Sequence, residues 1–74
     1  MIKIVLSGHA KYRLLERNVD VHEAKKVAKY GKIISENKGK IKKEGIYDKN
    51  KKIIVVCKNL SENVILLITV YYGN

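Results

Sequence analysis

The stretch KKIIVVCKNLSENVILLITVYY, residues 51–72, decides the fold of this chain. It contains two unbroken apolar runs, IIVVC and VILLITV, which suit strands that are covered on both faces or nearly so. The segment between the runs, Asn59 to Asn63, has the length of a hairpin loop. We therefore expect strands over 51–58 and 64–72 that pair with each other antiparallel.

Two further strands are predicted immediately upstream. They are KIISE at 32–36 and KIKKEGIYD at 40–48. Turn-forming residues separate the predicted strands, at Asn37–Gly39 and again at Asp48–Asn50. Because every gap is short, the four strands should form an antiparallel meander.

Two helices are predicted in the first half of the chain. Ser7 is placed to cap a helix over about 8–18. Asp20 begins a capping box for a second helix over about 21–30, whose apolar residues recur at helical spacing. Gly31 stands where a left-handed residue commonly ends a helix.

A short, partly buried strand at 2–6, IKIVL, completes the prediction. The fold class is α+β, with two N-terminal helices packed on one face of a four- or five-stranded antiparallel sheet. At 74 residues without a linker or repeat, the chain should form a single domain over 1–74. A domain of this size buries only about 60% of the surface that its unfolded chain exposes, so its core is small.

Positive charge dominates the composition. Sixteen Lys and Arg residues stand against seven Asp and Glu residues, which gives a formal net charge of +9. Such an excess attracts polyanions, so nucleic acid or an acidic protein is the expected partner. A single cysteine, the lack of a secretory signal and the lack of an apolar run of about 18 residues indicate a cytoplasmic protein without a membrane segment.

Both arginines of the chain lie in SGHAKYRLLERN, residues 7–18. On a helix, His9, Arg13 and Arg17 follow one another at intervals of four and share one face. A guanidinium can bind a phosphate in bidentate fashion, which a lysine ammonium cannot do. The alternative interpretation is a solvated stripe in which Glu16 pairs with a neighbour.

The longer segment SGHAKYRLLERNV, residues 7–19, resembles the signature of a small prokaryotic family, domain of unknown function 4258. That family in turn is similar to RelE- and BrnT-type toxins, compact metal-independent ribonucleases with a RelE/barnase-like fold. The resemblance implies an active-site region that contains His9, Arg13 and Arg17, joined by a hydroxyl from the last strand, for which Thr69 is the match. It also implies an antitoxin as protein partner. Asn18 stands where the family usually has glycine.

The inventory of side chains fits RNA cleavage without a metal. Such a reaction needs a base, an acid and cations that stabilise charge on the phosphorus oxygens, and a histidine with two arginines fits these roles. The acidic residues are scattered, and His9, His22 and Cys57 show no recognised ligand spacing. We therefore expect neither a metal nor a cofactor. For Cys57 we expect a buried, unreactive thiol.

Four more residues are candidates for binding nucleic acid: Tyr47, Tyr71, Lys42 and Lys43. Exposed tyrosines on a sheet can stack against unpaired bases, and lysines can contact phosphates. The alternative is that the tyrosines are amphipathic rim residues and the lysines a solvated turn.

Three hypotheses therefore follow from the sequence. The chain is a toxin-like enzyme that cleaves RNA, a non-catalytic basic module that binds nucleic acid, or a subunit that binds an acidic, antitoxin-like protein. The first and third hypotheses are compatible with each other.

Overall fold

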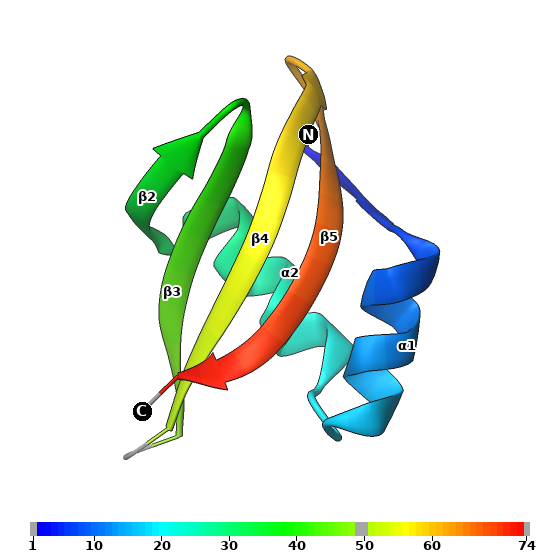
Figure 1. Ribbon diagram of the computed structural model, residues 1–74, viewed down its shortest axis with the longest axis vertical. Coiled ribbons are helices and arrows are strands. Elements are labelled where there is room, and N and C mark those ends of the chain that lie inside the picture. Colours follow the sequence, from blue (N-terminus) through cyan, green and yellow to red (C-terminus); the bar gives the residue numbers. More distant parts are fainter. Residues whose placement is uncertain (1, 49–50, 74) are drawn as a thin grey trace.

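The computed structural model describes residues 2–48 and 51–73, and within them the chain forms five strands and two helices (Figure 1). In chain order these are β1 (Lys3–Leu6), α1 (Gly8–Glu16), α2 (Val21–Tyr30), β2 (Lys32–Asn37), β3 (Lys40–Asp48), β4 (Lys51–Ser61) and β5 (Val64–Gly73). The strand order is β1-β5-β4-β3-β2. The last four strands form the predicted antiparallel meander, and β1 adds to β5 in parallel. The predicted α+β fold is confirmed.

Both helices contribute to a core on one face of the sheet. In Figure 1, α2 lies behind the sheet and α1 lies beside β5. The core joins small and aliphatic side chains of the helices to those of β4 and β5: Ala10, Leu14, Val19, Ala24, Val27, Ala28, Ile53, Val55, Leu67 and Val70. No helix covers the opposite face within the described residues, so this face is called the open face below. The apolar runs of β4 and β5 predicted strands covered on both faces or nearly so, whereas the described helices cover one face only.

Both predicted helix caps are confirmed. Ser7 Oγ accepts a hydrogen bond from Ala10 N at 2.9 Å, and Asp20 Oδ1 accepts one from His22 N at 2.8 Å. These side chains satisfy backbone N–H groups that have no partner within the first turn of a helix. Neither helix is long and apolar enough to cross a membrane.

Gly31 ends α2 in a way that differs from the prediction. Its backbone is extended, with φ −66° and ψ 160°, rather than left-handed. Glycine is required for a different reason, because a Cβ at this position would lie 2.5 Å from Val27 O and 2.9 Å from Glu44 O. Within the described residues, left-handed backbone occurs instead at Asn18, with φ 54°, in the link between the helices, and at Lys38 and Gly39 in the turn between β2 and β3.

The hairpin between β4 and β5 is also tighter than predicted. The sequence favours a loop over residues 59–63, whereas β4 continues to Ser61 and leaves only residues 62–63 in the turn. Asn59 pairs with Ile65 and Ser61 with Val64, with a register shift between these pairs. The apolar pattern did not predict this longer β4, because the added residues pair through backbone hydrogen bonds and include polar side chains.

Candidate functional site

Helix α1 takes the place of β1 beside the second half of β5. β1 pairs only with residues Val64 to Leu67. Beyond that point, Ser7 Oγ donates to Ile68 O at 2.9 Å and Arg17 Nη1 donates to Val70 O at 3.4 Å. Side chains around α1 therefore satisfy carbonyl groups along an otherwise unpaired sheet edge. This docking brings the polar stripe of α1 to the edge of β5.

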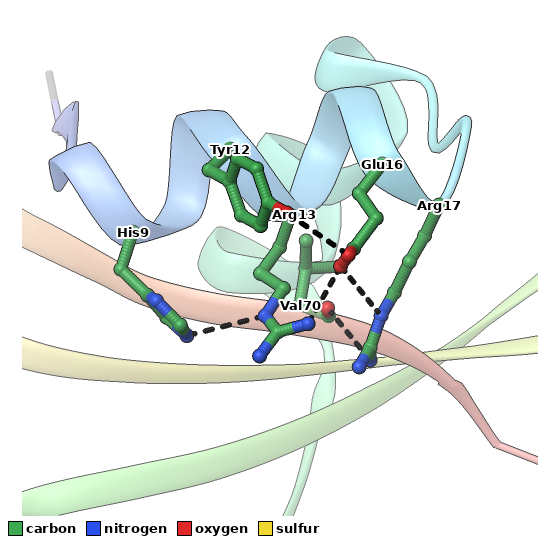
Figure 2. Close-up of polar contacts among 6 residues, drawn as sticks. All are labelled: His9, Tyr12, Arg13, Glu16, Arg17 and Val70. Carbon is green, nitrogen blue, oxygen red and sulfur yellow. Dashed lines mark hydrogen bonds and ion pairs between the residues drawn. The ribbon is translucent and has the colours of Figure 1, made fainter.

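The structure brings His9, Arg13 and Arg17 together on one side of α1. Figure 2 shows their side chains leaving the helix in the same direction, over β5. Arg13 Nε donates to His9 Nε2 at 3.3 Å. The side chains of Arg13 and Arg17 are 30% and 36% exposed, so both guanidiniums are partly sheltered and remain open to a ligand. We call His9, Arg13 and Arg17 the α1 stripe.

Glu16 completes this group. One carboxylate oxygen, Oε1, lies 2.6 Å from Arg13 Nη1 and 3.9 Å from Arg17 Nε. The other oxygen, Oε2, accepts a hydrogen bond from the Tyr12 hydroxyl at 3.2 Å. The hydrogen bond from Arg13 lowers the pKa of Glu16 below its ordinary value, and Tyr12 and Arg17 act in the same direction. From the sequence, Glu16 enters only the alternative interpretation, as the partner of a neighbouring side chain. That pairing is found here with Arg13, three residues before it.

Thr69 and Tyr71 point away from the helices. Thr69 pairs with Val56 and Tyr71 pairs with Ile54, whereas Val70 between them lies in the helix-facing core. Because side chains alternate along a strand, Thr69 and Tyr71 lie on the open face. No hydrogen bond joins Thr69 to the α1 stripe in the described part of the chain. The α1 stripe thus lies at the edge of β5, whereas Thr69 belongs to β5 and lies on its open face.

The two adjacent lysines predicted to bind nucleic acid have different environments. Lys42 lies on the open face, with its Nζ 6.0 Å from the centre of the Tyr71 ring, within the range of a cation–π contact. Lys43 is only 9% exposed, and its Nζ donates to Ala28 O in α2 at 2.6 Å. The predicted role of Lys43 in nucleic-acid binding is therefore wrong, because alternation along β3 turns it into the core. The side chain of Tyr47 lies outside the described part of the structure.

The remaining titratable candidates do not join this site. Cys57 is fully buried, as predicted, and burial raises the pKa of its thiol. His22 is exposed in the first turn of α2. Within residues 2–48 and 51–73, no three or more His, Cys, Asp or Glu side chains are grouped so that they could hold a metal ion.

Comparison with known proteins agrees with the fold and the motif. Residues 6–72 match the family described as domain of unknown function DUF4258. The chain belongs to the DUF4258 family. Its structure is also similar to the crystal structure of the ribonuclease toxin BrnT from Brucella abortus, with a TM-score of 0.76 over 100% of this chain and 99% of that chain. The two sequences are 12% identical, so the similarity shows a shared fold. A search of curated proteins finds no significant match.

The segment that predicted the family is also the segment that forms the candidate site of this DUF4258 chain. Residues 7–19 form the cap of α1, the helix itself and the link that follows it. Asn18 adopts the left-handed conformation that glycine tolerates best. Asparagine suits this turn because it enters the left-handed region more readily than most residues.

Proposed function

We propose that this DUF4258 chain is a metal-independent endoribonuclease of the toxin type, which cleaves RNA by attack of a 2′-hydroxyl on the adjacent phosphate. One observation carries the proposal. A histidine and two arginines form a single partly exposed stripe, held against the edge of β5, in a fold shared with a ribonuclease toxin. This stripe offers a proton-exchanging group beside two cations in a domain with a net charge of +9.

Each residue of the stripe has a defined part in the proposed reaction. Arg13 and Arg17 bind the phosphate oxygens and stabilise the charge that develops on them. His9 exchanges a proton with the attacking 2′-hydroxyl or with the leaving 5′-oxygen. In the free protein, His9 Nε2 accepts the 3.3 Å hydrogen bond from Arg13, so this nitrogen becomes available when Arg13 turns to a phosphate.

The bonds of the reaction balance without a further reactant. A bond forms between the 2′-oxygen and phosphorus, and the bond between phosphorus and the 5′-oxygen breaks. The proton lost by the 2′-hydroxyl is matched by the proton gained at the 5′-oxygen. The products are a 2′,3′-cyclic phosphate and a 5′-hydroxyl end.

The open face supplies a path for the rest of the RNA. Tyr71 presents an aromatic ring for base stacking, and Lys42 beside it presents a positive charge. The Thr69 hydroxyl lies on this face next to Tyr71 and is available to bind the substrate close to the edge of β5. We propose that the chain of nucleotides lies across this face and that the scissile phosphate reaches the α1 stripe over the β5 edge.

The proposal is tested by incubating labelled RNA with the purified protein in the presence and absence of EDTA. We expect cleavage in both conditions, a 2′,3′-cyclic phosphate product, and no cleavage of DNA of the same sequence, which lacks the 2′-hydroxyl. His9→Ala should lower the rate by about 100-fold or more, because the proton-exchanging group is lost. His22→Ala is the matched control and should retain the rate, since His22 lies in α2 away from the stripe. Equal cleavage by the wild type and His9→Ala, or none by either with ribosomes supplied, would refute the catalytic assignment.

A second candidate function is a non-catalytic module that binds RNA. The observation that favours it is the pairing of both arginines with Glu16, since such a network also serves a purely structural or phosphate-binding role. This function predicts binding of RNA without turnover. For either function we propose a cytoplasmic location and an acidic antitoxin as protein partner, because the net charge of +9 favours association with an acidic surface.

A further inference from the structure

The Glu16 carboxylate pairs with Arg13 and Arg17, the two cations that bind the RNA phosphate in the proposed function. Its Oε1 contacts Arg13 Nη1 at 2.6 Å and lies 3.9 Å from Arg17 Nε. We propose that Glu16 is a positioning residue, which holds Arg13 and Arg17 as a pair and competes with the phosphate for them. This inference rests on the proposed function and names a residue of the same site.

The geometry supports both parts of this role. Arg13 and Arg17 lie one helical turn apart, where two like charges repel each other. A carboxylate between them offsets this repulsion and orients their N–H groups toward one point (Figure 2). The Tyr12 hydroxyl fixes the second carboxylate oxygen at 3.2 Å, so the anion itself is held in place. A phosphate that approaches Arg13 Nη1 or Arg17 Nε meets a donor that already faces Glu16, and therefore competes with the carboxylate for it.

The environment of Glu16 argues against a different role, that of general base. The Arg13 contact keeps the pKa of Glu16 below its ordinary value, and a base is most effective when its pKa lies near the working pH. The carboxylate is therefore ionised and weakly basic at neutral pH. These properties suit a counter-anion that orders two cations.

The two parts of the role predict opposite changes in one variant. Glu16→Gln keeps the size of the side chain and removes its charge, which frees the arginines for phosphate and leaves them less well ordered. Affinity for RNA should therefore rise while the rate of the bound complex falls. A side chain that served only the stability of α1 would not separate binding from turnover in this way.

The experiment compares Glu16→Gln with Glu36→Gln. Each variant removes one of seven acidic residues, so the formal net charge rises from 16 − 7 = +9 to 16 − 6 = +10 in both. Glu36 is exposed on β2, at the sheet edge opposite to β1 and β5, and is a matched control for the change in charge. Thermal unfolding establishes that the variants are folded. Glu16→Asp serves as a further variant, because it keeps the charge and should retain affinity close to that of the wild type.

Affinity is measured by fluorescence anisotropy with an RNA whose 2′-hydroxyls are methylated and which cannot be cleaved. We expect Glu16→Gln to bind about fivefold more tightly than the wild type, as loss of a unit charge next to the bound phosphate in water predicts. Glu36→Gln should differ by less than about twofold, since two strands stand between β2 and β5 and charges separated by more than a Debye length are largely screened. With cleavable RNA, Glu16→Gln should show a lower KM and a kcat reduced by about tenfold, in line with the loss of a well-positioned guanidinium.

Each outcome decides between the inference and its alternatives. Equal affinity of Glu16→Gln and the wild type, or an equal gain in Glu16→Gln and Glu36→Gln, overturns the inference. A loss of cleavage by about 100-fold or more without tighter binding assigns Glu16 as general base and also overturns it. Tighter binding by Glu16→Gln, with cleavage by no protein, refutes the proposed ribonuclease and leaves competition for phosphate in a binding module. If no protein binds the methylated RNA, both the inference and the proposed function are refuted.

Discussion

At the scale of single residues, lysine and arginine have different parts in this chain. The Lys43 ammonium is buried and donates to Ala28 O, where its charge also complements the carbonyl end of α2. Arg13 and Arg17 each contact more than one group: Arg13 contacts His9 and Glu16, and Arg17 contacts Glu16 and Val70 O. A planar guanidinium with five donors allows such shared contacts, which a single ammonium on a flexible chain does not order in the same way.

Gly31 gives a prediction about stability at this scale. Gly31→Ala should lower the free energy of unfolding by about 1–3 kcal/mol, because overpacking forces the end of α2 away from β3. The new Cβ would meet two backbone oxygens, Val27 O at 2.5 Å and Glu44 O at 2.9 Å, and neither can move without the chain. Urea denaturation measures the change. Gly8→Ala is the control, since a Cβ at Gly8 meets nothing within 4 Å, and equal stability of the two variants would contradict the explanation from crowding.

At the scale of secondary-structure elements, the contact between α1 and β5 decides where the candidate site lies. β1 ends its pairing with β5 at Leu67, and Ser7 and Arg17 then satisfy carbonyls farther along the strand. The Tyr72 hydroxyl adds a hydrogen bond to Asn18 O at 3.1 Å, in the link after α1. The helix is therefore attached to the strand at both of its ends, which fixes the stripe relative to the sheet edge.

Ser7 gives a prediction for this contact. Ser7→Ala removes the cap of α1 and the hydrogen bond to Ile68 O, and should lower the free energy of unfolding by about 1–2 kcal/mol. Ser35→Ala, on the exposed edge strand β2, is the control and should change it by less than about 0.5 kcal/mol. Both are measured by urea denaturation. A Ser7→Ala variant as stable as Ser35→Ala would show that α1 docks without this side chain.

At the scale of the whole molecule, the strand order places the α1 stripe and the exposed edge strand β2 on opposite sides of the sheet. Helix α1 and strand β2 lie on opposite sides of the molecule (Figure 1). The α1 stripe lies at the β5 edge, and all six residues of β2 are exposed. The open face between them carries Lys42 beside Tyr71. With a net charge of +9 spread over so small a domain, the electrostatic field extends beyond the site itself and increases the rate of encounter with a polyanion.

This charge predicts a strong dependence of RNA binding on salt. Affinity for a short single-stranded RNA should fall by about tenfold or more between low and physiological salt, because each neutralised phosphate releases counterions. Arg13→Ala should reduce the slope of log affinity against log salt by about 0.7, the value for one phosphate contact on a single strand. Anisotropy titrations at several salt concentrations measure both quantities. Affinity that stays constant across this range would contradict binding of a polyanion.

The sequence alone determined the features that depend on local pattern. Apolar periodicity and turn residues set the helices and strands, and the side chains of Ser7 and Asp20 set both helix caps. Helical spacing placed His9, Arg13 and Arg17 on one face. These features follow from residues within a few positions of one another, so no knowledge of the final packing was needed.

Only the tertiary structure decided which side of each strand meets the helices. Alternation separates Lys42 from Lys43 and Thr69 from Val70, but it does not say which member of a pair is buried. The pairing of β4 with β5 also skips Ile68 in its register, which local pattern did not indicate.

The remaining features arise where distant segments approach each other. β1 pairs with β5 across about 60 residues of sequence, α1 covers the β5 edge that β1 leaves unpaired, and Gly31 must be glycine because Glu44 of β3 passes close by. Such contacts depend on how complete elements pack, and their partners have no shared signal in the sequence. The residue types and helical spacing of the α1 stripe are therefore local properties of the sequence, whereas packing against β5 decides where these side chains are presented.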